Sequence, residues 1–120
     1  MIVAASPVNR IVVTRIVERA GLKAMAFSPE AAPSALAEQN PAIVVLDGDP
    51  SFDPDLFLAE TITKQRRIRH NLPLAVLLTT DARRKNESAQ GSFDAVVVKP
   101  ITPEVLQPVI DDLMVRAGQQ

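Results

Sequence analysis

The sequence has no cysteine, only four glycines, no long apolar run and no excess of either charge, and each of these features excludes a class of protein. Without cysteine, disulfides, iron–sulfur clusters, zinc–thiolate sites and thiol catalysis are excluded. With 13 basic and 14 acidic residues the net charge is −1, which provides no long-range field to attract nucleic acid or an anionic membrane. No apolar run approaches the roughly 20 residues that a membrane helix needs.

The scarcity of glycine also argues against a nucleotide- or cofactor-binding enzyme. Neither a Gly-x-Gly-x-x-Gly motif nor a glycine-rich loop ending in Lys-Ser/Thr occurs, so the chain has no recognisable backbone cradle for phosphates. Residues 1–7 lack the basic region and long apolar stretch of a signal peptide. A chain of 120 residues suits one domain, residues 1–120. The lack of cysteine fits a reducing cytosol, so we expect a cytoplasmic globular domain.

Short apolar runs separated by helical signals predict the fold class. The runs are continuous rather than alternating, which is typical of parallel strands covered on both faces; they span residues 2–5, 22–27, 42–46, 74–78 and 95–98. A strand–helix alternation repeated five times indicates an α/β protein with a doubly wound parallel sheet. The first helix carries an apolar face and ends near Gly21; this face comprises Val12, Val13, Ile16, Val17 and Ala20.

The predicted helix starts share one device, a capping side chain placed directly before a proline. The capping oxygen accepts from a free backbone N–H, and the proline has no donor to lose; the pairs are Ser6-Pro7, Ser28-Pro29, Asp53-Pro54 and Thr102-Pro103. Pro33 and Pro108 fall beyond the first turn, so the helix there either starts later or kinks. Residues 81–90 have almost no apolar stripe, and we expect a short, solvent-facing and mobile segment there.

Polar residues follow the apolar runs, where α/β sheets place their binding sites. Asp47 and Asp49 follow the third run, Thr79 the fourth and Lys99 the fifth. A carboxylate, a hydroxyl and an ammonium at one edge can bind or accept a phosphoryl group, because the carboxylate attacks and the other two stabilise charge. Taken alone, Asp47-Gly48 is an ordinary turn dipeptide, so the joint placement carries the interpretation.

Four segments resemble the receiver domains of two-component response regulators, and the resemblance covers essentially the whole chain. They are PVNR at residues 7–10, VVLD ending at Asp47, LLTT ending at residue 80, and GSFDAVVVKPIT at residues 91–102. The resemblance implies a flavodoxin-like five-stranded parallel sheet of order 2-1-3-4-5 with helices on both faces. By position it makes Asp47 the phosphoacceptor, Thr79 the switch hydroxyl and Lys99 the charge partner of the phosphoryl group, and it implies a cis Lys99-Pro100 bond.

The sequence departs from this family where the family usually holds Mg²⁺. The acidic pair that precedes the PVNR segment is replaced by Ala4 and Ala5. Mg²⁺ is usually bound by one or two carboxylates with waters and phosphate, so Asp47 is left as the obvious ligand and Asp49 as a possible second one. We therefore expect Mg²⁺ to bind weakly if at all, and phosphorylation of Asp47 to suffer from uncompensated like-charge repulsion.

Three functional hypotheses follow. The first is an atypical receiver that binds signalling partners, such as a histidine kinase, a phosphotransfer protein or another signalling protein, with phosphorylation weak or absent. The second is a fully competent receiver that accepts phosphate from a histidine kinase or phosphotransfer protein at Asp47. The third, disfavoured by the missing glycine-rich loops, is a nucleotide or cofactor enzyme on the same sheet. Neither of the first two is an enzyme, and neither requires nucleic acid or a membrane.

Overall fold

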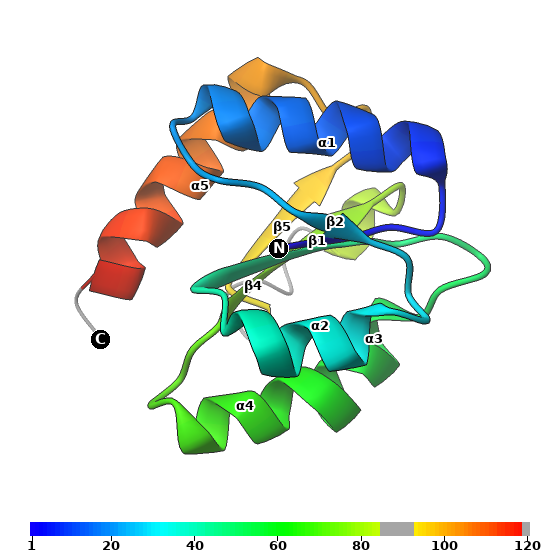
Figure 1. Cartoon of the computed structure of the whole chain (residues 1–120). Coiled ribbons are helices and arrows are strands. Elements are labelled where there is room, and N and C mark those ends of the chain that lie inside the picture. Colours follow the sequence, from blue (N-terminus) through cyan, green and yellow to red (C-terminus); the bar gives the residue numbers. More distant parts are fainter. Residues whose placement is uncertain (85–92, 119–120) are drawn as a thin grey trace.

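A computed structural model describes residues 1–84 and 93–118 (Figure 1). Five parallel strands form one sheet in the order β2-β1-β3-β4-β5, which confirms the predicted topology. The strands are β1 (Ile2–Val3), β2 (Ala26–Phe27), β3 (Ile43–Asp47), β4 (Leu74–Thr79) and β5 (Ala95–Val98). We call the edge at which these strands end the carboxyl edge, and the opposite one the amino edge.

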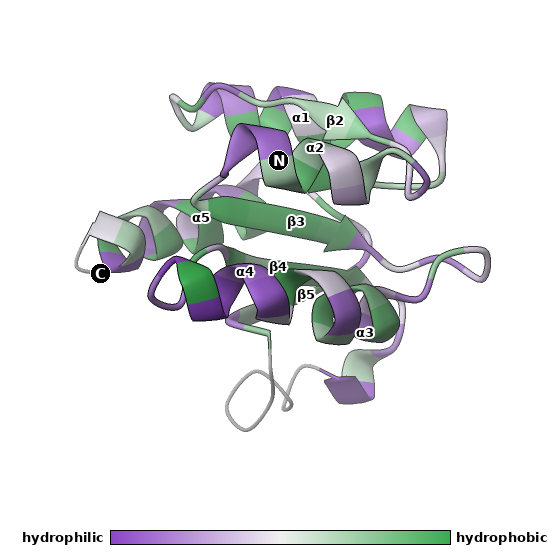
Figure 2. Cartoon of the chain, turned by 60° about the horizontal axis from the view of Figure 1, so that its bottom comes forward, coloured by the Kyte–Doolittle hydropathy of each residue, from purple (hydrophilic) through white to green (hydrophobic). Residues whose placement is uncertain are grey.

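Helices cover both faces of the sheet, as the continuous apolar runs predict. One face packs against α1 (Pro7–Arg19) and α5 (Pro103–Gly118). The other packs against α2 (Ala32–Gln39), α3 (Pro54–Phe57) and a π-helical segment, η1 (Leu58–Ile62), which continues into α4 (Thr63–Ile68). Every residue of β3 and β4 is buried, and Figure 2 shows β3 as a hydrophobic strand between helices. Two hydrophobic cores therefore hold the carboxyl edge of the central strands in place.

The predicted helix caps are partly confirmed. Ser6 Oγ accepts from the backbone N–H of Asn9, and Asp53 Oδ1 accepts from two backbone N–H groups of the first turn of α3. The prediction at Ser28 is wrong, because α2 begins only at Ala32 and has no side-chain cap. Pro33 thereby falls in the first turn, where its missing N–H costs nothing. Pro108 instead lies inside α5.

Two further sequence predictions need correction. Of the apolar run at residues 22–27, only Ala26–Phe27 pair with β1, because the preceding residues run from the left-handed turn at Gly21 (φ +90°) to the sheet. Val12 was predicted on the buried face of α1, but 43% of its surface is exposed. The predicted mobile segment at residues 81–90 lies mostly outside the described residues; in its described part, 81–84, residues 82–84 form one 3₁₀ turn.

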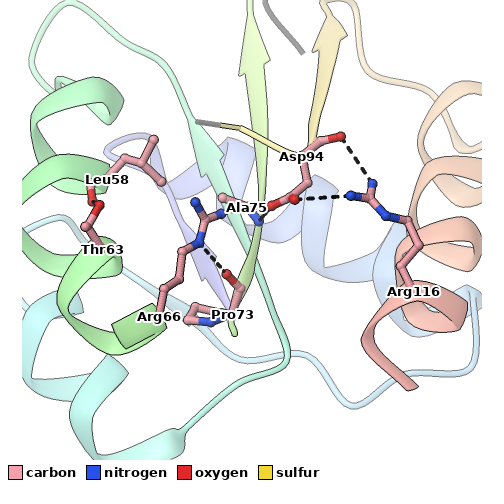
Figure 3. Close-up of polar contacts among 7 residues, drawn as sticks. All are labelled: Leu58, Thr63, Arg66, Pro73, Ala75, Asp94 and Arg116. Carbon is pink, nitrogen blue, oxygen red and sulfur yellow. Dashed lines mark hydrogen bonds and ion pairs between the residues drawn. The ribbon is translucent and has the colours of Figure 1, made fainter. Parts of the chain in front are cut away.

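Both the π-helical segment and the proline bonds are local departures from regular geometry. The hydroxyl of Thr63, the first residue of α4, donates to the carbonyl oxygen of Leu58 at the start of η1 over 2.9 Å, beside the backbone N–H of Thr63 that donates to the same oxygen (Figure 3). The Lys99–Pro100 bond is cis, as predicted, and Leu72–Pro73 is cis as well.

Within the described residues, no helix is both long and apolar enough to span a bilayer.

An ion-pair network joins the helices of both faces at the amino edge (Figure 3). Asp94, just before β5, accepts through Oδ2 from Arg66 Nη2 of α4 and from the Ala75 backbone N–H, both over 2.8 Å. Its Oδ1 lies 3.3 Å from Arg116 Nη2 of α5. Arg66 Nε also donates to the carbonyl oxygen of Pro73 over 3.1 Å. One carboxylate thus ties α4, β4 and α5 together.

Candidate functional site

Asp47 ends β3 at the carboxyl edge, and only 1% of its surface is exposed. The turn that follows is shaped by Gly48, whose backbone N–H donates to the carbonyl oxygen of Leu78 over 2.8 Å. A side chain at this position would place its Cβ 3.1 Å from the same oxygen, which is tighter than ordinary contacts. Gly48 therefore allows β3 to turn close against β4, and this close turn leaves the Asp47 side chain buried beneath the edge.

Two side chains from other elements contact the Asp47 carboxylate. Lys99 Nζ lies 2.5 Å from Asp47 Oδ1 and donates a hydrogen bond to the carbonyl oxygen of Gly48 over 3.0 Å. Asn9 Nδ2 donates to Asp47 Oδ2 over 2.7 Å. The contact to Lys99 is an ion pair without hydrogen-bond geometry, and no described residue donates a hydrogen bond to Oδ1. The structure thus brings together Asp47 and Lys99, as the sequence predicts, and adds Asn9.

The sequence analysis missed the roles of Asn9 and Arg10, which both lie in the first turn of α1. The Ser6 cap and Pro7 start this helix directly after β1, so its first turn lies over the carboxyl edge. Arg10 Nη1 donates to the carbonyl oxygen of Ala4 over 2.7 Å and, more weakly, to that of Ala5 over 3.4 Å. The sequence could have indicated both residues, because residues in the first helical turn after a strand face the edge where that strand ends.

Thr79 ends β4 and is 8% exposed, but its hydroxyl points to backbone groups rather than to Asp47. Its Oγ1 accepts from the backbone N–H of Asp81 over 3.1 Å, and its carbonyl oxygen accepts from the backbone N–H of Lys99 over 2.7 Å. Thr79 lines an open cavity of about 450 Å³, while Asp47 and Lys99 line a separate cavity of about 250 Å³ beside α1. The three predicted residues therefore share one edge but face two cavities.

Asp49 lies in the cavity of Thr79 and is turned toward Ser51. Its Oδ1 accepts from the backbone N–H of Ser51 over 2.8 Å and from the Ser51 hydroxyl over 2.7 Å, and these bonds lower the pKa of the Asp49 carboxyl. Asp47 and Asp49 thus do not converge on one cavity. Across residues 1–84 and 93–118, no three carboxylates or histidines are grouped so as to hold a metal ion.

The residues around Asp47 do not fit Mg²⁺, the cofactor that the sequence resemblance implies. Mg²⁺ binds oxygen ligands, usually including one or two carboxylates. Here Ala4 and Ala5 contribute methyl groups, and their carbonyl oxygens accept from Arg10. The Asp47 oxygens face an ammonium and an amide N–H, which are donors and have no lone pair for a cation. The chain's own groups therefore occupy the approach that a cation would need.

No protein-family model matches the chain, and no curated protein sequence does. Solved structures do. The anti-anti-sigma factor PhyR from Bartonella quintana matches with a TM-score of 0.74 at 16% identity; the match covers 99% of this chain but only 48% of PhyR, so the chain spans about half its length. The chemotaxis protein CheY4 of Vibrio cholerae matches with a TM-score of 0.75 at 20% identity over 93% of this chain and 94% of CheY4.

The BeF₃-activated receiver domain of DrrB is also similar, with a TM-score of 0.67 at 18% identity over 95% of this chain and 94% of that domain. These matches and the sheet order β2-β1-β3-β4-β5 show that the chain has the receiver-domain, flavodoxin-like fold. At identities this low the likeness concerns the fold, and the chemistry of the site has to be argued from the residues themselves.

Proposed function

We propose that the chain is a receiver-type signal-transduction domain that acts by binding signalling proteins, and that Mg²⁺-dependent phosphorylation of Asp47 is weak or absent. The receiver fold and the Asp47–Lys99 pair at its carboxyl edge support the first part. Ala4 and Ala5, in place of carboxylates, support the second. The partners that suit such a domain are a histidine kinase, a phosphotransfer protein or another signalling protein, and the domain itself is not an enzyme.

The charges around Asp47 explain why phosphoryl transfer is disfavoured. A carboxylate that attacks a phosphoryl donor approaches an anion, and catalysis of such transfers depends on cations that neutralise the phosphoryl oxygens. Lys99 is the one cationic side chain in contact with the Asp47 carboxylate among the described residues, and its charge is already used by the ion pair. Arg10 is held on the carbonyl oxygens of Ala4 and Ala5. Little positive charge is left to stabilise an incoming phosphoryl group.

Helix α1 supports partner binding because it exposes apolar side chains beside the site. Val8, Ile11 and Val12 are 67%, 56% and 43% exposed. They lie three and four positions apart, so they form one stripe on the helix. Val12 also lines the cavity of Asp47, which places this apolar surface next to the carboxylate. Exposed apolar stripes of this kind mark protein-binding surfaces.

The test is to incubate the protein with a small-molecule phosphodonor, with and without Mg²⁺, and to measure the intact mass. We expect little or no addition of a phosphoryl group in either condition. The matched control is Asp47→Asn, which keeps the size of the side chain and removes the nucleophile. Rapid and stable addition in the wild type that needs Mg²⁺ and disappears in Asp47→Asn would contradict the proposal.

A fully competent phospho-receiver is the second candidate, and one observation favours it. Asp47, Thr79 and Lys99 all end their strands or follow them at the same carboxyl edge. Titration with Mg²⁺, followed by NMR shifts of the residues around Asp47, separates the candidates. Saturable shifts that are lost in Asp47→Asn support the competent receiver, and their absence at millimolar Mg²⁺ supports the atypical one.

A further inference from the structure

We propose that the amino edge of the sheet carries a second site, an apolar cavity that takes a small apolar carboxylate and pairs its charge with Lys23. The cavity measures about 200 Å³ and lies where β1 and β3 begin, between the C-terminal halves of α1 and α5. It shares no lining residue with either cavity of the carboxyl edge. This site therefore goes beyond the proposed function and does not depend on Asp47.

The inner wall of the cavity is made by side chains of the hydrophobic core. They are aliphatic and none is more than 7% exposed; they are Ile2, Val17, Ile43, Val45 and Ile110. Such groups offer no hydrogen bond to a water molecule, which needs about two to four polar partners in a cavity. Apolar cavities of about 150 Å³ bind benzene. The walls and the volume therefore suit an apolar body of about the size of a benzene ring.

Flexible side chains lie around the outer part of the cavity. Met114, which is 36% exposed, lines the cavity itself. Met1 lines both this cavity and a neighbouring one of about 180 Å³, which Met25 also lines. These are all three methionines of the chain. Because methionine is unbranched and adapts to irregular shapes, this part of the wall can adjust to a ligand while the core stays in place.

Lys23 provides the charge at this end of the molecule. It is exposed, lines both neighbouring cavities, and is the only charged side chain among the described residues that line either one. The amino group of Met1 donates to the carbonyl oxygen of Ile43 over 2.9 Å, and burial lowers its pKa to about 6, so it adds little charge at neutral pH. The carbonyl oxygen of Pro41, another lining residue, accepts from Arg69 Nη1 over 2.7 Å. These positive charges complement an anionic group on the ligand.

The shape of this region favours a small molecule over a second protein. Of the described apolar residues that line the two cavities, only Met25 and Met114 are classed as exposed, at 41% and 36%. Protein-binding surfaces expose larger continuous apolar patches. Small-molecule sites are instead concave and mostly apolar, with a few polar groups that fix the orientation of the ligand. A small aromatic or aliphatic carboxylic acid is the ligand class that fits.

The first experiment titrates the full chain with benzoate and follows the backbone amides by NMR. Benzyl alcohol and benzylammonium are the neutral and the positively charged counterparts of similar size. We expect saturable shifts of the lining residues with benzoate, at a dissociation constant of about 1 mM, and weaker binding of the two counterparts. The absence of such shifts at about ten times this concentration, or equal binding of benzoate and benzylammonium, would overturn the inference.

Lys23→Glu tests the charge, and Lys64→Glu is the matched control. Lys64 is also exposed and lines neither cavity, so its variant makes the same change in net charge elsewhere. We expect Lys23→Glu to weaken benzoate binding about fivefold, the effect of an exposed ion pair, and to reverse the preference between benzoate and benzylammonium. Lys64→Glu should change neither. A structural role of Lys23 alone would not reverse the preference, so an unreversed preference would overturn the inference.

Ala42→Leu tests the cavity. Ala42 is half-buried, packs against the core and lines the cavity, so the larger side chain occupies part of the volume. We expect benzoate binding to weaken about tenfold, the loss of roughly two buried methylene groups of contact. Unchanged affinity in the folded variant would overturn the inference; if it does not fold, the Lys23 variant decides. Association of the free protein that protects Met25 and Met114 would also overturn it, because a second copy would then cover the site.

Discussion

Two carboxylates at opposite edges of the same sheet show how differently this fold uses an ion pair. Asp94 at the amino edge is 18% exposed in its side chain, and both oxygens contact guanidinium groups while one also accepts a backbone N–H (Figure 3). Asp47 at the carboxyl edge is almost fully buried and contacts one ammonium and one amide. The more exposed carboxylate is thus the better satisfied one.

The two carboxylates also differ in where their partners come from. The partners of Asp94 come from α4, β4 and α5, so its bonds hold elements of both faces together. The partners of Asp47 come from the segments that follow β1 and β5. These segments line a cavity of about 250 Å³ at the carboxyl edge of the sheet. Oδ1 of Asp47 has no hydrogen bond from the described residues. Asp47 thus lies beside a cavity and is held by one ion pair and one hydrogen bond, whereas Asp94 connects elements of both faces.

The largest effect is expected for Asp94→Ala. It leaves the largely buried guanidinium of Arg66 and the backbone N–H of Ala75 without this acceptor. We expect a loss of about 3–4 kcal/mol in the free energy of unfolding, because the substitution removes contacts to two guanidinium groups and a backbone hydrogen bond at once, and a hydrogen bond to a charged group is worth about 1.5–3 kcal/mol. Urea denaturation measures it. Arg116→Ala is the matched control. The contact of Arg116 with Asp94 is longer and more exposed, so its loss should cost about 0.5 kcal/mol. Equal losses for the two variants would contradict the stabilising role of Asp94.

Lys99→Met should have the next largest effect. It keeps the length of the side chain but leaves the buried Asp47 charge with the Asn9 amide alone. We expect a loss of about 2–3 kcal/mol at neutral pH, somewhat below a fully buried pair because Lys99 is 21% exposed. Adding Asp47→Asn to this variant should restore most of the loss. If the two substitutions are additive in a double-mutant cycle, the ion pair does not compensate Asp47 as proposed.

The smallest effect concerns Asp49, which shares the edge with Asp47 but is only half-buried and accepts hydrogen bonds from Ser51. Hydrogen bonds from Ser51 lower the pKa of Asp49, so their contribution to stability is present above the ordinary pKa and is lost as the pH falls through the lowered value. Ser51→Ala removes the hydroxyl bond and should raise this pKa toward its ordinary value. NMR titration of the side-chain carbon measures it, and an unchanged pKa would contradict the assigned cause.

Sequence patterns predicted the elements better than the contacts between them. The apolar run at residues 95–98 matches β5, and the sheet order and the cis Lys99–Pro100 bond agree with expectation. The prediction at Ser28 was wrong because Ser-Pro is also a turn signal, and here the carbonyl oxygen of Ser28 accepts from Ala31 and Ala32 in a turn before α2. Local patterns do not distinguish a cap from the turn that precedes it.

The sequence by itself determined which residues arrive at the carboxyl edge, because strand ends are set by local apolar runs and parallel strands end together. That is why Asp47, Thr79 and Lys99 could be predicted to share this edge. Only the tertiary structure decided which side chains at this edge are in contact. Asn9 donates to Asp47 across 38 positions of sequence, Arg10 donates to the carbonyl oxygen of Ala4, and Thr79 lines another cavity. Such contacts depend on the position of α1 over the sheet and on side-chain rotamers. Both are determined by the packing of segments that lie far apart in the sequence.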